Sequence, residues 1–363
     1  EIRPRDWSSD VCSSDLNTAN GYQALYANTT GGRNSAVGAY ALNLNTTGSW
    51  NTAVGYGALN ANTTGNYNTA YGYYSLGSNS TGEQNTTVGY GALTANTTGS
   101  YNTSVGYGAL TANTTGQYNV AVGQTGLYSN TTAYSNTAIG NAALYQNTTG
   151  DSNTAIGGNA LQNNTTGAYN VGVGKSSLYT NSTGQRNAAI GAYSMYYNTT
   201  GSYNTSVGDY AGYSLTTGNG NVQIGPVNSS GSYAPVFYAT TENNRVAIGS
   251  TAVTNAYIQV AWTVVSDARD KTNFNTVPHG LDFVNQLKPT AYQFRTARDS
   301  EETNGSVRYG FKAQDILALE GDAPVIIDNE DPDKLKYNSD SLIPVLVNAI
   351  QELTVRLEIL ENK

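Results

Sequence analysis

A repeat of 17 residues, kept without insertion or deletion, constrains this chain more than any other feature of the sequence. The pattern is N-x-x-V/I-G-x-x-A/S-L-x-x-N-T/S-T-G-x-x, and its first Asn recurs thirteen times from Asn17 to Asn221. A glycine occupies the fifth position of every copy, and a leucine occupies the ninth position of ten copies. Each copy must therefore form the same structural unit, stacked on its neighbours.

The repeat predicts a β-solenoid. Each copy contains two short strand-like pieces, NTAVG and xALxxN, separated by turns with Gly, and none has helical spacing. We therefore expect a mostly β fold in which residues 17–225 form a β-solenoid or β-roll shaft of 17-residue coils. Coils stacked at ~4.8 Å would make the shaft about 60 Å long.

The interior of such a shaft would be thin. Only the Val or Ile and the Leu of each copy are dependably large and apolar, so we expect both inside, with Ala, Ser or Thr filling the rest. So little buried apolar area does not offset the ordering of each coil. We therefore expect three chains to associate along the shaft as a homotrimer.

Composition excludes several classes of function. Only 12% of the residues are charged and the net charge is -8, so a nucleic-acid partner is not expected. No apolar run is long enough for a membrane-spanning helix, and we expect no membrane insertion. Asp is nearly absent from the repeats, which argues against a calcium-binding β-roll.

Three repeated motifs have a functional and a structural interpretation. The Asn-Thr-Thr triplets, such as the one at Asn96, match a glycosylation acceptor, but we expect hydrogen-bond ladders at turns. Gly174-Lys175-Ser176 imitates the end of a phosphate-binding loop, yet it lies in register with the repeat. The tyrosines after the fixed glycine could stack on sugars or form a plain solvent-facing ladder; they are Tyr56, Tyr73, Tyr90 and Tyr107.

The first 16 residues differ from the repeats. The stretch DWSSDVCSSDL resembles a translated sequencing adapter, so we treat residues 1–16 as non-native. The only cysteine, Cys12, lies within it, and we expect no disulfide, no metal site and no cofactor in the rest of the chain.

Composition changes after the repeats. Residues 226–265 read as a β-rich junction in which Val246-Ala247-Ile248-Gly249 is a last echo of the repeat. Residues 266–363 contain 11 Lys and Arg and 17 Asp and Glu, as expected of a globular domain. We predict a small α+β domain; its expected elements are helices over 281–287 and 314–319, strands over 290–294, 307–311 and 323–327, and a C-terminal helix capped by Asp340 or Ser341, with Pro344 in its first turn.

The C-terminal helix carries an apolar seam with steps of three and four residues, as in a coiled coil. The seam consists of Ile343, Leu346, Ile350, Leu353, Leu357 and Leu360. A seam this short fits intramolecular packing as well as association of chains. Beside a trimeric shaft, we expect it to join three chains.

Few residues of this domain could perform chemistry. Its one histidine, His279, lies in a turn before a helix, and we interpret it as structural. Without cysteine, a serine activated by a lysine amine remains, which needs no histidine. Ser266 and Lys271 lie at the domain junction, although their spacing alone carries no weight.

The context of this pair resembles a known family. The segments SDARDKTNF, LKPTAYQF, YGFKAQDI and the YNSDSLIPVLVNAIQELTVRLEILE tail are similar to the C-terminal intramolecular chaperone domain of endosialidases and phage tail fibres, a self-cleaving serine peptidase. The shaft repeats resemble those of trimeric autotransporter adhesin heads and phage tail-fibre shafts. The resemblance implies a domain over residues 266–363 that trimerises, assists folding of the fibre and then releases itself.

The resemblance also implies roles for individual residues. Ser266 would be the nucleophile and Lys271 the base, with cleavage at the Val265-Ser266 bond. Asp267 and Arg269 match the family motif and would shape the pair or the trimer contact. Asp270 stands where an apolar residue is usual, and a carboxylate beside Lys271 favours its charged form. Cleavage could therefore be slow or absent here, and folding assistance would survive its loss.

The sequence thus favours a trimeric phage tail fibre or appendage shaft in the virion, which binds a glycan or protein receptor on the host surface. A bacterial surface adhesin with the same chaperone domain is the alternative. A glycan-degrading tailspike is less favoured, because Glu83, Asp151 and Asp209 lie too far apart along the shaft to act as a catalytic pair.

Overall fold

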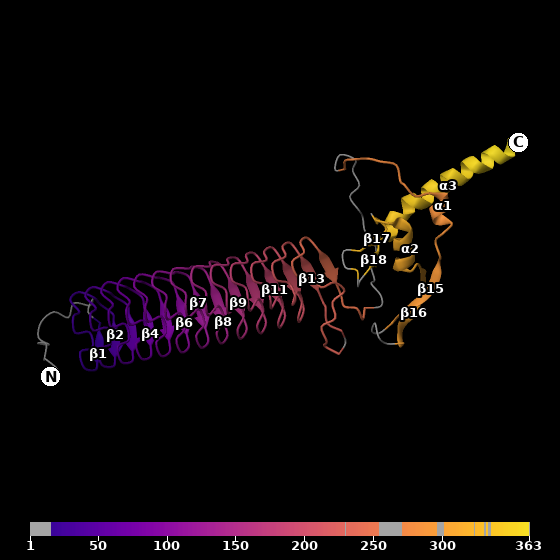
Figure 1. Ribbon diagram of the computed structural model, residues 1–363. Helices are drawn as coiled ribbons and strands as arrows, with labels where there is room; N and C mark the ends of the chain where they lie inside the picture. Colours follow the sequence, from indigo (N-terminus) through magenta and orange to yellow (C-terminus); the bar gives the residue numbers. More distant parts are fainter. Residues whose placement is uncertain are drawn as a thin grey trace, which may run out of the picture. The chain divides into compact units, whose positions relative to one another are not determined.

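The computed structural model describes residues 16–228, 230–253, 271–295, 301–322, 324–329, 332 and 335–362. The chain divides into two compact units, Glu1–Val253 and Thr254–Lys363, which we call the shaft unit and the C-terminal unit (Figure 1). Of the predicted adapter-like residues 1–16, all but Leu16 lie outside the described residues.

The shaft unit is a β-solenoid with one short strand in each coil. Its strands form a single 14-stranded sheet in sequence order, and neighbouring strands pair parallel. Thr52 lies opposite Thr69, so the register equals the repeat. Figure 1 shows the stacked coils. The strands are β1 Thr18–Asn20, β2 Ser35–Val37, β3 Thr52–Val54, β4 Thr69–Tyr71, β5 Thr86–Val88, β6 Thr103–Val105, β7 Val120–Val122, β8 Thr137–Ile139, β9 Thr154–Ile156, β10 Val171–Val173, β11 Ala188–Ile190, β12 Thr205–Val207, β13 Val222–Ile224 and β14 Val246–Ile248. The predicted solenoid is confirmed, and β14 is the predicted last echo of the repeat.

The second strand-like piece of each repeat is not a strand. Tyr74 and Leu76 have left-handed backbone conformations, with φ of 48° and 54°, and the same conformation recurs at these positions along the shaft. Such residues cannot continue a strand, and each is less stable than an extended residue by roughly 1–2 kcal/mol. Hydrogen bonds between coils compensate, as in the Leu76 N–H donating to the Ala92 carbonyl at 2.9 Å. The xALxxN piece is therefore a sequence of turns.

The interior contains Leu and Ala but not the Val or Ile. Ala53 is fully buried in β3, whereas its neighbours Thr52 and Val54 point outward, because successive residues of a strand face opposite sides. Leu59 is fully buried and packs in the same core. The expectation that Val and Ile lie inside is wrong. Elsewhere the same inward position holds the larger Thr87 and Gln223, both buried, and the β-branched residue of the fourth position remains outside.

Two ladders of buried asparagine fill the remaining interior. The Asn51 side chain donates from Nδ2 to the Gly65 carbonyl at 2.9 Å and accepts the Asn68 N–H at 2.9 Å. Asn62 donates to the Asn45 side-chain oxygen at 2.8 Å and to the same Gly65 carbonyl at 2.9 Å. The predicted ladders at Asn-Thr-Thr are thus confirmed. Since Asn62 and its equivalent Asn96 are fully buried, these triplets are not accessible to a glycosylating enzyme in the folded shaft.

Glycine occupies the fifth position of every repeat for a steric reason. Gly106 adopts φ +136°, and a Cβ built on it would collide with the Gly123 carbonyl of the next coil. Both the backbone conformation and the close approach therefore exclude a side chain at the fifth position of the repeat.

The C-terminal unit is α+β. Its elements are α1 Leu281–Val284, β15 Thr290–Arg295, β16 Thr303–Gly310, α2 Ala313–Glu320, β17 Ile327–Asp328, β18 Lys336–Tyr337 and α3 Ser339–Glu361. β15 and β16 form an antiparallel hairpin, and β17 pairs antiparallel with β18. The core consists of Phe283, Ile316, Ile326, Ile327, Leu342 and Val345.

Three predicted details of this unit are wrong. Helix α1 ends at Val284 rather than residue 287. The strand expected over 323–327 is reduced to β17, since only Ile327 and Asp328 find a partner strand. Helix α3 begins at Ser339 after Asn338, without a side-chain cap, so Pro344 lies inside the helix rather than in its first turn.

Candidate functional site

Most of the predicted catalytic motif lies outside the described residues. This applies to Val265, Ser266, Asp267 and Arg269. Lys271 is the first residue described after them; its side chain is exposed and it begins an irregular segment that leads to α1. The Ser266 and Lys271 pair and its cleavage bond therefore remain sequence predictions.

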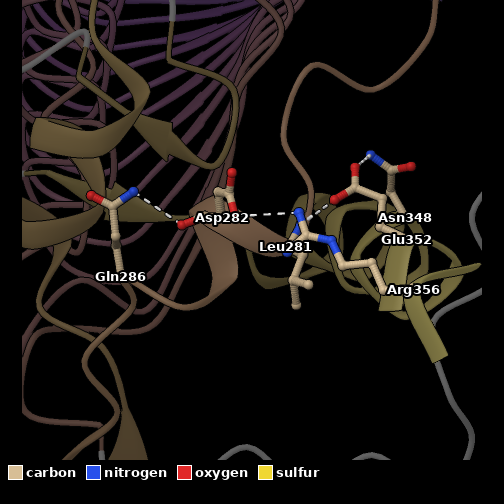
Figure 2. Close-up of polar contacts among 6 residues, drawn as sticks. All are labelled: Leu281, Asp282, Gln286, Asn348, Glu352 and Arg356. Atoms are coloured by element: carbon tan, nitrogen blue, oxygen red, sulfur yellow. Dashed lines mark hydrogen bonds and ion pairs between the residues drawn. The ribbon is translucent and has the colours of Figure 1, made fainter. Parts of the chain in front are cut away.

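The irregular segment is held at its far end by helix α3. The Glu352 carboxylate accepts a hydrogen bond from the Leu281 N–H at 2.8 Å, at the start of α1. Asn348, one turn earlier, donates to the His279 carbonyl at 2.8 Å. Its side-chain nitrogen lies 3.5 Å from the Glu352 carboxylate (Figure 2). A Cβ on Gly280 would meet the Glu352 carboxylate, so a side chain at this position would displace Glu352 from its contact with the Leu281 N–H. We call Glu352 and Asn348 the α3 clamp.

A weaker pair lies at the edge of the clamp. Arg356 lies 3.7 Å from Asp282, with both side chains more than half exposed (Figure 2). The Gln286 side chain donates to the Asp282 carbonyl at 3.0 Å, which closes the turn after α1. Exposed pairs of this kind contribute about 0–1 kcal/mol, so the clamp itself provides most of the polar attachment.

A cavity of about 550 Å³ adjoins the clamp, with His279, Phe283, Leu319 and Glu352 among its lining residues. The His279 ring stacks on Phe283 with 4.3 Å between centroids, in agreement with its interpretation as structural. Sequence reasoning missed the clamp. The available signal was the spacing of Asn348 and Glu352, which places both side chains on one helix face.

The predicted seam is exposed on α3. Leu342, Val345 and Ala349 occupy the opposite face and are buried in the core of the unit. Within the described part of the chain, the seam takes no part in that core: its residues are Ile343 (57% exposed), Leu346 (38%), Ile350 (64%), Leu353 (44%), Leu357 (50%) and Leu360 (66%).

The shaft presents a second exposed apolar surface. The residues at the fourth position of the repeats form a row on the outer face of the sheet, which we call the Val/Ile row. Ile139 is 40% exposed and Ile190 is 45% exposed. The row is Val37, Val54, Val88, Val105, Val122, Ile139, Ile156, Val173, Ile190, Val207 and Ile224, with Tyr71 in place of one member.

Aromatic side chains stack along the shaft. Tyr56, Tyr73, Tyr90 and Tyr107 form the predicted ladder, with centroids 5.5, 5.0 and 5.3 Å apart. Because the ring faces cover one another, this ladder leaves mainly ring edges and hydroxyl groups for contact with another molecule.

Two kinds of feature are absent from the described residues. No group of three or more His, Cys, Asp or Glu side chains is placed to hold a metal ion. No described helix has the length and apolar character needed to cross a membrane.

Comparison with known proteins identifies the C-terminal region. Residues 266–323 match the family model of the chaperone of endosialidase, Peptidase_S74. No curated protein and no solved structure matches the chain. The match confirms the resemblance of this region, and the family implies a chaperone domain of the self-cleaving serine-peptidase type.

Proposed function

We propose that this protein is a three-chain fibre whose C-terminal unit brings the chains together, assists folding of the shaft and then releases itself. The observation that carries the proposal is the pair of apolar surfaces, the Val/Ile row and the α3 seam, that one chain leaves exposed. A β-solenoid shaft next to a chaperone-of-endosialidase domain fits such a fibre.

The Val/Ile row favours contact between copies of the chain. The row runs along the sheet from Val37 to Ile224, beside the outward Thr side chains of the second position. No Asp, Glu, Lys or Arg occurs at either position in β1–β13. A long, uncharged, β-branched surface of this kind is typical of an interface rather than of a solvated face.

A separate chaperone solves a problem that the repeat creates. If two shafts slide by one coil, nearly every residue meets an equivalent one, so register is weakly specified. Three α3 helices that associate first would fix which coils meet. After release of the C-terminal unit, the shaft could no longer unfold by the reverse of its assembly. The fibre would therefore be kinetically stable.

The release step assigns roles to the predicted residues. Lys271 would accept the Ser266 hydroxyl proton as the oxygen attacks the Val265 carbonyl carbon, and the Val265-Ser266 bond would break as its nitrogen takes up a proton. Water would hydrolyse the resulting ester and restore the hydroxyl. Asp267 and Arg269 would support the pair or the contact between chains.

A structural fibre of this kind fits attachment to a cell surface. We favour a phage tail fibre or appendage shaft that contacts a glycan or protein of the host. A bacterial adhesin with the same chaperone is the alternative, because the described residues are compatible with either.

Expression of residues 17–363 tests the self-release. On a denaturing gel, the parent chain should split at residue 266, slowly because Asp270 lies beside Lys271, whereas Ser266→Ala and Lys271→Ala should stay whole. Ser341→Ala, a serine outside the motif, serves as the control and should cleave as the parent does. Cleavage that persists in both site variants would contradict the assigned roles.

A further inference from the structure

The side chains at the seventeenth repeat position form a column along the shaft. Trp50 stacks on Tyr67 with centroids 6.1 Å apart, and Tyr101 stacks on Tyr118 at 4.9 Å. One coil separates the two stacked pairs, and it carries Gln84 in place of an aromatic residue. The column is therefore interrupted between two aromatic pairs.

The interruption has the width of one six-membered ring. Tyr67 and Tyr101 lie two coils apart, which corresponds to roughly 9.6 Å at the usual strand spacing. A ring stacked between two others needs about 4.5–5 Å on each side. A ring stacked on Tyr67 would therefore have to displace the Gln84 side chain, which donates to the Tyr101 hydroxyl.

A hollow adjoins Tyr67 at this coil, and Tyr101 is not among its lining residues. It has a volume of about 400 Å³ and is lined by Tyr67, Gln84 and Thr86. Tyr67 is 55% exposed, and its ring face opposite Trp50 is directed toward the coil of Gln84. The Gln84 amide donates to the Tyr101 hydroxyl over 3.4 Å, a long hydrogen bond that a ligand hydroxyl can replace. One aromatic wall with an amide and a hydroxyl suits a ring that is apolar on its face and polar at its edge.

The charges near the hollow select a neutral ligand. Glu83 precedes Gln84 in the chain, and its carboxylate accepts a hydrogen bond from Asn66 at 2.9 Å. No cation lines the hollow. The Arg33 guanidinium lies on Trp50, 4.1 Å from the ring centroid. Because no charged side chain lines the hollow, an acidic sugar would find no cation there to balance its charge.

We propose that this hollow binds one neutral pyranose ring of a cell-surface polysaccharide. The ring would stack on Tyr67, and its hydroxyl groups would bond to Gln84 and Thr86. This inference rests on the proposed attachment role and names its ligand class. A single-ring site binds weakly, and three copies on a fibre would raise the overall avidity.

Saturation-transfer NMR on the full chain with Ser266→Ala tests the site. The probes are chitotetraose, maltotetraose and mannotetraose, with tetragalacturonic acid as the anionic comparison and the free monosaccharides as the second comparison. At least one neutral tetrasaccharide should bind, and more tightly than its monosaccharide. The anionic probe should not bind.

Two variants and a matched control locate the binding. Tyr67→Ala removes the wall, and Gln84→Tyr fills the gap while it completes the aromatic column, so the shaft should remain folded. Each should reduce binding at least tenfold. Tyr118→Ala, a column residue with the same 55% exposure, should bind as the parent does.

Three results would overturn the inference: no neutral probe binds, Gln84→Tyr binds normally, or the anionic probe binds best. Light scattering on the same samples distinguishes failure of the sugar site from failure of the proposed fibre. If the protein is a trimer but binds no sugar, only the proposed sugar site is refuted. If the protein is a monomer, the proposed fibre is refuted regardless of sugar binding.

Discussion

At the fifth repeat position, the next coil leaves no room for a side chain. We predict that Gly106→Ala destabilises the shaft by about 1–3 kcal/mol or more, because alanine must adopt a left-handed backbone and its Cβ meets the Gly123 carbonyl. Gly158→Ala is the control, since no atom lies within 4 Å of its Cβ. Thermal unfolding compares the two. Equal melting temperatures would contradict the steric explanation.

A carboxylate near the end of the shaft should make its last coil sensitive to acid. Partial burial acts to raise the pKa of Glu242, but hydrogen bonds from the Thr240 and Thr241 N–H groups and the Thr240 hydroxyl outweigh it and hold the pKa below its ordinary value. Because the pKa of Glu242 is lower in the folded chain than in the unfolded chain, its ionised carboxylate stabilises the fold at pH values above the ordinary pKa range of glutamate. This stabilisation is lost as the pH falls through the lowered pKa.

Amide hydrogen exchange at Thr240 and Thr241 measures this effect. Beyond the intrinsic pH dependence of exchange, protection should fall as the pH is lowered below the ordinary range of a glutamate carboxyl. Glu242→Gln should show no such loss, because its side chain does not titrate. Equal pH dependence in the two proteins would contradict this role.

The sequence predicts some residue roles and misses others for a physical reason. Fixed Gly and Asn predict turns and ladders, because few residues can replace them there. The alternation Thr52-Ala53-Val54 predicts a strand but not which face is inside. Hydrophobicity favours Val54 inside, whereas the structure buries Ala53. The buried Thr87 and Gln223 at the equivalent position show that size alone does not decide the face.

At the scale of single elements, the α3 clamp joins α3 to the start of α1. We predict that Glu352→Ala destabilises the C-terminal unit by about 1–3 kcal/mol, since the Leu281 N–H loses its acceptor. Urea unfolding, followed by exchange of α1 and α3 amides, measures the change. Glu358→Ala, an exposed glutamate of the same helix, should have little effect. An equal effect of both would refute the clamp.

The exposed seam of α3 should decide chain association. We predict that Ile350→Asp with Leu353→Asp yields single chains, because a carboxylate is strongly disfavoured at the core of a coiled coil. Val355→Asp is the matched control, since Val355 is 55% exposed but lies off the seam. Sedimentation measures the number of chains. Retention of the trimer in the double variant would contradict the role of the seam.

Element boundaries in the C-terminal unit were harder to predict than element types. The helix around residues 314–319 is confirmed as α2, and the hairpin is confirmed as β15 and β16. The β17 strand was overestimated because its length depends on its partner, Lys336–Tyr337, which has no strand-like pattern of its own. The clamp was missed because Asn348 and Glu352 acquire a role only when α3 packs against His279 and Leu281.

For the whole molecule, the problem of aligning identical coils between chains accounts for the presence of both units. The shaft gains its stability from contacts between identical coils, which leaves register open and an apolar row exposed. The C-terminal unit has an ordinary core and an exposed seam, so it can fold first and align the chains. The match of residues 266–323 to the chaperone of endosialidase agrees with this division of roles.

The number of chains in solution tests the central claim most directly. Light scattering on residues 17–363 with Ser266→Ala, which keeps both units joined, should give the mass of three chains at every concentration tested. The released shaft of the parent protein should also remain a trimer after cleavage. A stable monomer with an intact shaft would contradict the account, because its Val/Ile row and α3 seam would then persist without a partner.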